Sequence, residues 1–89
     1  MPKRIQDKSV RGSEKISPVQ CKMARVAVGF GVRELAAAAD VVPDTIVRFE
    51  RGENLRDRTV AAIRNALEAA GVEFIAENGG GRGVRLRKG

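Results

Sequence analysis

Residues 32–51 read VRELAAAADVVPDTIVRFER, and this stretch decides the fold. Residues 32–39 are rich in alanine and carry their apolar side chains at helical spacing. Pro43 stands where a second helix can begin, because the first helical residue needs no N–H donor. Asp40 lies between them and tolerates the positive φ of a sharp turn. The stretch therefore predicts two short helices at a steep angle, the second ending at Gly52.

The packing of these two helices follows from their side chains. Ala36 is small enough to let the second helix approach, since the distance between helices depends on the side chains in contact. Val41 is expected to fill the corner from inside, and Ile46 and Phe49 to face the core. The outer face of the second helix then carries Asp44, Thr45, Val47 and Arg48.

Apolar spacing predicts one helix before this pair and one after it. The first begins at the N-cap Ser17 and Pro18 and ends at Gly29 and Gly31. We expect its buried face to consist of Val19, Met23, Val26, Ala27 and Phe30. The last helix covers residues 57–70. Its core positions are Val60, Ile63, Leu67 and Ala70.

The hydrophobic period changes after Gly71. Residues 72–75 and 84–87 are strand-like runs separated by the glycine-dense segment AENGGGRG. Two short strands alone are marginal in water, so their open edges could pair with the same strands of a second subunit. The alternative is a frayed tail after Ile75. The residues expected to mediate dimerisation are Val72, Phe74, Ile75, Val84 and Leu86.

Together these elements predict a mostly α fold. A compact four-helix, helix-turn-helix domain spans residues 17–71, and residues 72–89 form a C-terminal β-hairpin, or dimerising strands, with a basic tail. Residues 1–16 have many charges and little apolar periodicity, so we expect a flexible, disordered basic arm. A core of this size buries only about 60% of the unfolded surface, so a partner subunit would help.

The net charge of +6 is concentrated at the two ends of the chain. Residues 1–25 carry seven Lys/Arg and two acids, and residues 82–88 carry four basic residues and no acid, whereas residues 26–81 are net negative by three. This distribution is typical of a nucleic-acid reader with basic arms, and nearly as typical of a protein with floppy basic tails. In the first case Lys3 and Arg4 could follow a DNA groove; a disordered leader is the alternative.

Residue usage excludes several classes of site. One cysteine and no histidine leave no internal disulfide, no usual zinc site and no Ser-His or Cys-His nucleophile. Cys21 is expected to be a small buried side chain. No apolar run is long enough to span a bilayer, and no secretory signal is present. We therefore expect a cytoplasmic protein that is not an enzyme, binds no cofactor or metal and makes no membrane contact.

From residue 17 to residue 70 the chain resembles the lambda-repressor-like, or XRE-type, helix-turn-helix regulators of bacteria and phages. The matching positions are Arg25, Leu35-Ala36, Ile46 and Phe49-Glu50-Arg51-Gly52. In that family an interior ion pair joins the residues that fall on Arg25 and Glu50. Glu50 follows a core residue and would otherwise be partly buried without compensation, so we predict a bidentate Arg25–Glu50 pair.

Three positions depart from the family pattern. Val32 replaces a phosphate-binding glutamine, Val42 replaces a hydroxyl cap, and Pro43 replaces a base-reading glutamine. Base readout should therefore fall on Pro43, Asp44, Thr45, Val47 and Arg48. Phosphate contacts are expected from Arg33, Arg51, Arg56 and Arg58. Alternatively, Arg58 pairs with a nearby acid.

These features predict a homodimeric, sequence-specific regulator that represses a pseudo-palindromic operator in double-stranded DNA, with one recognition helix per half-site. One alternative is an antitoxin-like or phage-control protein that binds its own promoter and also a protein partner. A third possibility is an adaptor that links proteins without reading sequence. Binding that depends on salt but not on DNA sequence would favour the adaptor.

Overall fold

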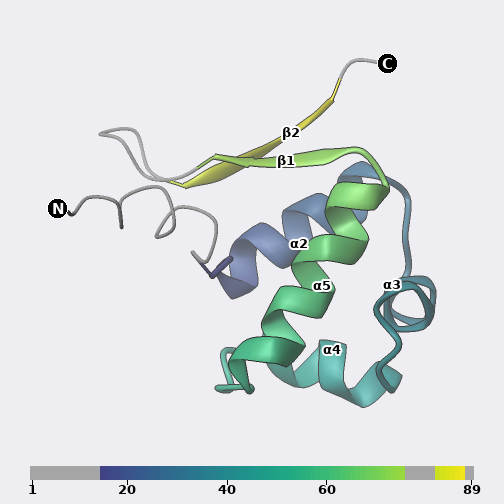
Figure 1. Cartoon of the computed structure of the whole chain (residues 1–89), viewed down its shortest axis with the longest axis vertical. Helices are drawn as coiled ribbons and strands as arrows, with labels where there is room; N and C mark the ends of the chain where they lie inside the picture. The colour runs from purple at the N-terminus through teal and green to yellow at the C-terminus, as the bar shows by residue number, and fades with distance from the viewer. Residues whose placement is uncertain (1–14, 76–81, 88–89) are drawn as a thin grey trace, which may run out of the picture.

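Four helices precede a two-stranded hairpin in the computed structural model, which describes residues 15–75 and 82–87. The helices are α2 (Pro18–Ala27), α3 (Val32–Ala39), α4 (Pro43–Glu50) and α5 (Asp57–Ala69), and the strands are β1 (Val72–Ile75) and β2 (Gly83–Leu86). The hairpin lies across α2 and α5, at the end of the molecule opposite α4 (Figure 1). The predicted mostly α class, with helices followed by a hairpin, is confirmed.

Local backbone chemistry sets the bounds of α2. The Ser17 hydroxyl accepts a hydrogen bond from the Gln20 N–H at 3.1 Å, and the Gln20 side-chain oxygen accepts from the Ser17 N–H at 2.9 Å. This reciprocal capping box satisfies two N–H groups that a helix start leaves open. At the other end Gly29 has a φ of 78°, so the chain can reverse after Ala27 without strain.

The turn between α3 and α4 is built as the sequence predicts. Asp40 has a φ of 60°, and the N–H of Val41 donates to the Ala36 carbonyl at 2.9 Å, which closes the end of α3. Val41 packs against the core from the corner. Pro43 is the first residue of α4, and its N-cap Val42 makes no side-chain capping bond.

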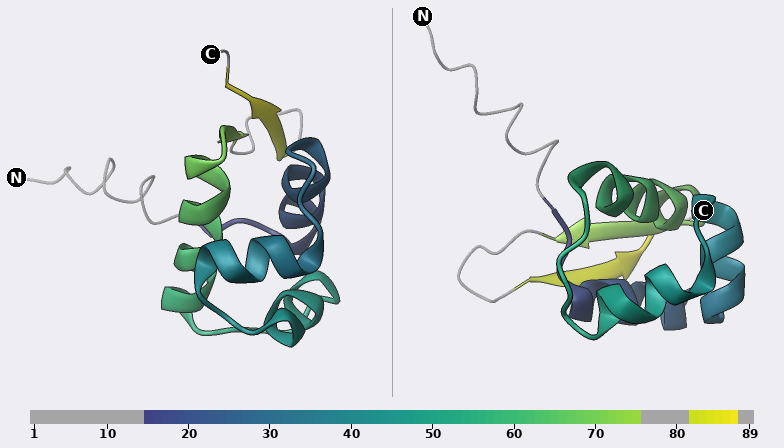
Figure 2. Two further views of the ribbon diagram at one scale, coloured as in Figure 1. Left: turned by 90° about the vertical axis from the view of Figure 1, so that its right-hand side faces the viewer. Right: turned by 90° about the horizontal axis from the view of Figure 1, so that it is seen from below.

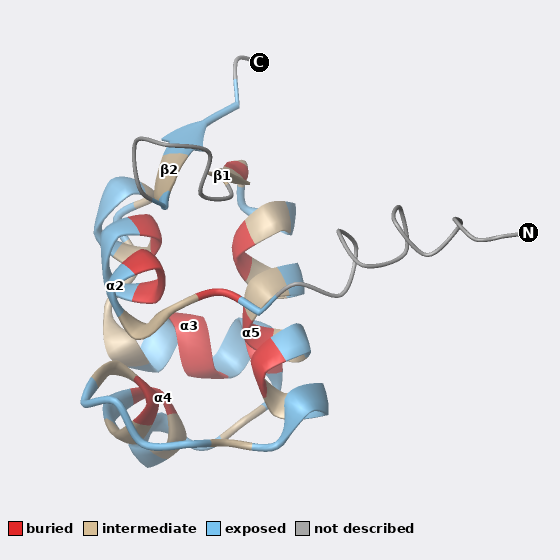
Figure 3. Ribbon diagram, turned by 90° about the vertical axis from the view of Figure 1, so that its left-hand side faces the viewer, coloured by how far each residue is buried: buried red, intermediate tan, exposed pale blue. Residues whose placement is uncertain are grey.

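The core lies between the helices, whose buried segments face one another (Figure 3). Its members with less than a tenth of their surface exposed are Ile16, Cys21, Ala24, Leu35, Ala36, Ala39, Ile46, Phe49, Val60, Ile63, Leu67 and Val72. The expected core positions of α4 and α5 are confirmed, except that Ala70 is exposed. None of the helices in residues 15–75 has the length and hydropathy needed to cross a membrane.

The predicted buried face of α2 is wrong. Val19 is 65% exposed, Val26 is 63% exposed, and Met23 and Ala27 also face outward; of the predicted set, Phe30 alone packs against the core. The buried residues of α2 are instead Gln20, Cys21 and Ala24. The helix is turned this way because the Gln20 side-chain amide donates to the carbonyls of Ile75, at 3.3 Å, and Gly83, at 3.0 Å.

Lys15 and Ile16 do not belong to the arm expected over residues 1–16. Ile16 is 4% exposed and belongs to the core, and the Lys15 ammonium lies 2.7 Å from a carboxylate oxygen of Asp57. Burying a large aliphatic side chain stabilises the chain enough to order this segment. The remaining part of the predicted arm, with Lys3 and Arg4, lies outside the described residues.

The two strands pair antiparallel within one chain, in the register Val72↔Leu86, Glu73↔Arg85, Phe74↔Val84 and Ile75↔Gly83. Figure 2 shows β1 beside α5 and β2 beside α2. Val72 is buried, Phe74 and Val84 pack on the same core, and Leu86 is 51% exposed. Three of the five residues expected to mediate dimerisation therefore contact their own helices, so a partner would meet Leu86, Ile75 and the strand edges.

Candidate nucleic-acid interface

α4 has a buried side and an exposed side. Ile46 and Phe49 are 0% and 5% exposed and hold the helix against its neighbours. Val42 and Val47 are 62% and 39% exposed, and Pro43 and Asp44 also lie at the surface. Val42 is the N-cap and Val47 lies inside the helix, so the exposed side of α4 presents apolar as well as polar side chains.

The buried side is braced by the predicted ion pair. The Arg25 Nε donates to one Glu50 carboxylate oxygen at 2.8 Å, and its Nη2 donates to the other at 2.9 Å. Nη1 donates to the Phe30 carbonyl at 3.2 Å, and the Cys21 thiol donates to Glu50 at 3.3 Å. The side chains of Arg25 and Glu50 are 14% and 11% exposed. The bidentate prediction is confirmed, and the pair ties α2 to the last turn of α4.

The pKa shifts at this pair follow from burial and from charge. Burial raises the pKa of Glu50, but the hydrogen bonds from Arg25 and Cys21 and the charge of Arg25 outweigh it, so the pKa of Glu50 lies below its ordinary value. The bond to Glu50 raises the pKa of Arg25. Burial, followed by the neighbouring Glu50 carboxylate, raises the pKa of Cys21 far above that of a free thiol. Cys21 is therefore an inert thiol donor, as expected for a buried cysteine.

The exposed side carries a looser cluster of charges around Arg48. The Arg48 Nε donates to a Glu53 carboxylate oxygen at 3.1 Å, and its Nη1 lies 3.6 Å from Asp44. The other Glu53 oxygen accepts from Arg51 at 3.2 Å. The bond to Glu53 raises the pKa of Arg48, and the bonds from the two arginines lower the pKa of Glu53. Glu53 therefore bonds both Arg48 and Arg51. The sequence analysis did not predict this role, because it depends on how the chain turns after α4.

A groove of about 540 Å³ borders the exposed side of α4. It brings Thr45 and Arg48 next to Arg56, which the sequence assigned to separate base and phosphate roles. It is also lined by Asn54 and Thr59, two hydrogen-bonding side chains that the sequence reading did not single out. Their positions in the sequence could have indicated this, because Asn54 follows the end of α4 at Gly52 and Thr59 lies in the first turn of α5.

The other predicted phosphate contacts, Arg33, Arg51 and Arg58, do not line this groove. Arg33 is exposed on α3, and Arg58 is exposed on α5. Within residues 15–75 and 82–87, Arg33, Arg56 and Arg58 make no ion pair, so the expected alternative partner for Arg58 is not found there. Arg51 is exposed but shares Glu53 with Arg48.

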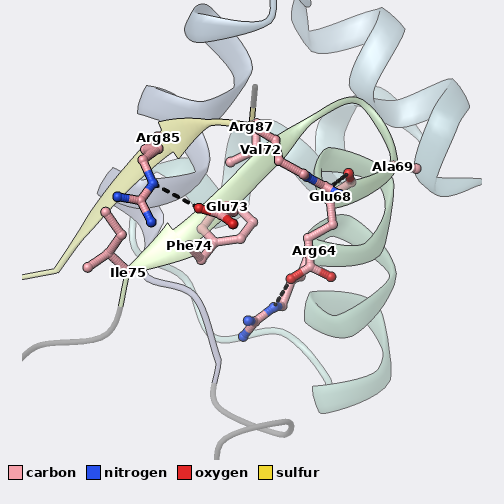
Figure 4. A pocket seen from close by; sticks show the side chains of 9 residues that line it. All are labelled: Arg64, Glu68, Ala69, Val72, Glu73, Phe74, Ile75, Arg85 and Arg87. Atoms are coloured by element: carbon pink, nitrogen blue, oxygen red, sulfur yellow. Dashed lines mark hydrogen bonds and ion pairs between the residues drawn. The ribbon is translucent and has the colours of Figure 1, made fainter. Parts of the chain in front are cut away.

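A hollow of about 780 Å³ lies between α5 and the hairpin, at the other end of the molecule (Figure 4). Arg64 bonds Glu68 at 2.9 Å and stacks over the Phe74 ring, and Arg85 bonds Glu73 at 2.8 Å. The lining of this hollow holds three arginines and two glutamates, so the two signs of charge nearly cancel and the hollow is a poor site for a polyanion. The described residues contain no group of three or more metal-ligating side chains.

No protein-family model matches the chain, and a search of curated proteins finds no significant match to it.

Proposed function

We propose that the chain is a lambda-repressor-like, sequence-specific DNA-binding regulator that acts as a homodimer on a pseudo-palindromic operator. The observation that carries this proposal is the exposed side of α4. It offers Thr45 and Arg48 beside a groove, while the opposite side is fixed to α2 by Arg25 and Glu50. A short, rigidly held helix with polar and apolar side chains outward has the form that enters a major groove.

Each exposed side chain has a base-pair chemistry. Arg48 can donate to O6 and N7 of guanine, and Asp44 or Thr45 can accept from N4 of cytosine. Val47 and Pro43 can contact a thymine methyl group. Phosphates would be held by Arg33, Arg56 and Arg58, which make no ion pair within the described residues. Arg51 would add a further phosphate contact once it leaves Glu53.

Dimerisation is proposed at the free edge of β2. Leu86 is half exposed there, and an unpaired strand edge presents backbone donors and acceptors to a second copy. A two-fold axis at this edge would relate two copies of α4, as an operator with two half-sites requires. Repression would follow from occupying the promoter.

The test is Arg48→Ala in a gel-shift assay with an operator obtained by selection from randomised oligonucleotides. We expect binding to the selected operator to fall about 10- to 100-fold, because a bidentate arginine–guanine contact is lost. The melting temperature should stay unchanged, because the Arg48 side chain is 43% exposed. The matched control is Lys15→Ala, which removes the same charge from an exposed ion pair with Asp57, outside α4 and the hairpin.

Two results would overturn the proposal. One is a selection that yields no preferred sequence while binding remains salt-dependent, which would favour the adaptor. The other is an Arg48→Ala variant that binds the operator as well as the Lys15→Ala control does.

A further inference from the structure

The last turn of α4 brings Glu53 back beside Arg48. Gly52 has a φ of 100°, its N–H donates to the Phe49 carbonyl at 2.9 Å, and the Glu53 N–H donates to the Arg48 carbonyl at 3.0 Å. These two bonds form a Schellman motif, in which a residue with positive φ reverses the chain over the helix end. Glu53 is therefore fixed to Arg48 through its backbone before its side chain is considered.

The Glu53 side chain then engages the same residue. One carboxylate oxygen accepts from the Arg48 Nε and the other from the Arg51 Nη2, at 3.1 and 3.2 Å. Both oxygens are thus used, and the carboxylate is held between two guanidinium groups. With its Nε occupied, Arg48 keeps the N–H groups of its two terminal nitrogens, of which Asp44 approaches one at 3.6 Å. Those terminal groups can donate to O6 and N7 of guanine.

We propose that Glu53 is a positioning residue that fixes the direction of the Arg48 side chain and so sets the preference for guanine in each half-site. An arginine loses side-chain freedom when it binds a base, and a partner that holds it beforehand reduces that loss. The inference rests on the proposed function, because it assigns Glu53 a role in the same interface.

Two roles of Glu53 can be separated, because its charge affects the affinity for any DNA and its positioning of Arg48 affects the preference for guanine. Glu53 places a negative charge beside a surface that would meet phosphates, so its removal should strengthen binding to DNA of any sequence. If Glu53 positions Arg48, its removal should also weaken the preference for guanine. Total affinity and base preference therefore move in opposite directions, and a measurement of both separates the two roles.

The experiment compares Glu53→Ala with Glu53→Gln on the full chain. Both remove the same charge, but glutamine keeps an oxygen that can accept from the Arg48 Nε. We expect both variants to bind scrambled DNA more tightly than the unmodified protein, by similar factors. We expect Glu53→Ala to lose ~2- to 10-fold of the preference for the guanine whose recognition depends on Arg48, the range for losing one pre-ordered side chain. Glu53→Gln should retain most of it.

The matched control is Glu73→Ala. Glu73 bonds Arg85 at 2.8 Å, and its side chain is 45% exposed, close to the 46% of Glu53, but it lies on the hairpin. This control should leave the guanine preference unchanged.

Each remaining outcome contradicts a stated claim. If Glu53→Ala keeps the full guanine preference, or if Glu53→Gln loses as much as Glu53→Ala, positioning by Glu53 is wrong while the proposed function stands. If the unmodified protein selects no sequence, the proposed function fails, and the positioning role fails with it.

Discussion

The two sides of α4 use the same pair of residue types in opposite ways. On the inner side Arg25 and Glu50 share two bonds at 2.8 and 2.9 Å, with side chains 14% and 11% exposed. On the outer side Arg48 and Glu53 share one bond at 3.1 Å, with side chains 43% and 46% exposed. Burial decides what each pair contributes, since exposed ion pairs are worth little and a broken buried pair leaves an uncompensated charge.

The difference in burial gives the two sides of α4 different roles. The inner pair is shielded from salt and water, so it holds the helix in one orientation. The outer pair is screened, so its guanidinium can exchange one partner for another at small cost. Substitutions on the inner side should change the stability of the fold, and those on the outer side should change binding.

The largest effect is expected from Arg25→Ala. Removing the guanidinium leaves Glu50 largely buried without its partner, which should lower the free energy of unfolding by on the order of 3 kcal/mol. Urea denaturation followed by circular dichroism would measure the loss. The outer control Arg51→Ala, which removes a 63% exposed arginine, should cost less than about 1 kcal/mol. If the two variants lose the same free energy of unfolding, the inner pair contributes no more to stability than the outer one.

The second largest effect is expected when the stability of the fold is measured at acid pH, because the two glutamates should respond differently. The pKa of Glu50 is lowered in the folded state, so its contribution to stability is present above the ordinary glutamate pKa of about 4.3 and is lost as the pH falls through the folded value. The pKa of Glu53 is lowered too, but its bonds are exposed and should be screened at about 1 M salt.

Melting temperatures measured from pH 7 to pH 3 in high salt would test this difference. The curve for Glu50→Gln should be flatter than that of the unmodified protein, and the curve for Glu53→Gln should follow the unmodified protein. A Glu53→Gln curve as flat as that of Glu50→Gln would contradict the assignment of Glu50 as the acid-sensitive group.

The smallest effect is expected from Val42→Thr on the outer side. Val42 is the N-cap of α4, is 62% exposed and makes no capping bond, so a hydroxyl there can accept from a free N–H. We expect a gain of about 0.5 to 1 kcal/mol, read from the denaturation midpoint. Val47→Thr, on the same exposed side but inside the helix, is the control and should give no gain. If Val42→Thr stabilises the fold no more than Val47→Thr does, the start of α4 has no N–H group that a capping hydroxyl can satisfy.

Local signals predicted the bounds of most elements. Ser17, Asp40, Pro43 and Gly52 act within a few residues of themselves, so the caps, the turn and the helix ends could be read from the sequence. The Arg25–Glu50 pair came from the resemblance and was then found with the expected bidentate geometry.

Long-range contacts explain what the sequence did not predict. Gln20 is buried because its amide meets strand carbonyls 55 and 63 positions away, and no hydrophobic period could place it inside in preference to Val19 or Met23. The role of Glu53 could not be predicted from the sequence, because its bond to Arg48 depends on the backbone reversal at Gly52. The groove with Asn54 and Thr59 required the relative placement of α4 and α5.

The Gln20 amide has a consequence for how the chain can vary. It donates to the carbonyls of Ile75 and Gly83, the last pair of the ladder before the strands separate. The register is thus anchored at this pair by a contact from α2. We therefore expect insertions or deletions between these two residues to be accepted with little loss of stability, which makes this connection a natural place for a tag or a label.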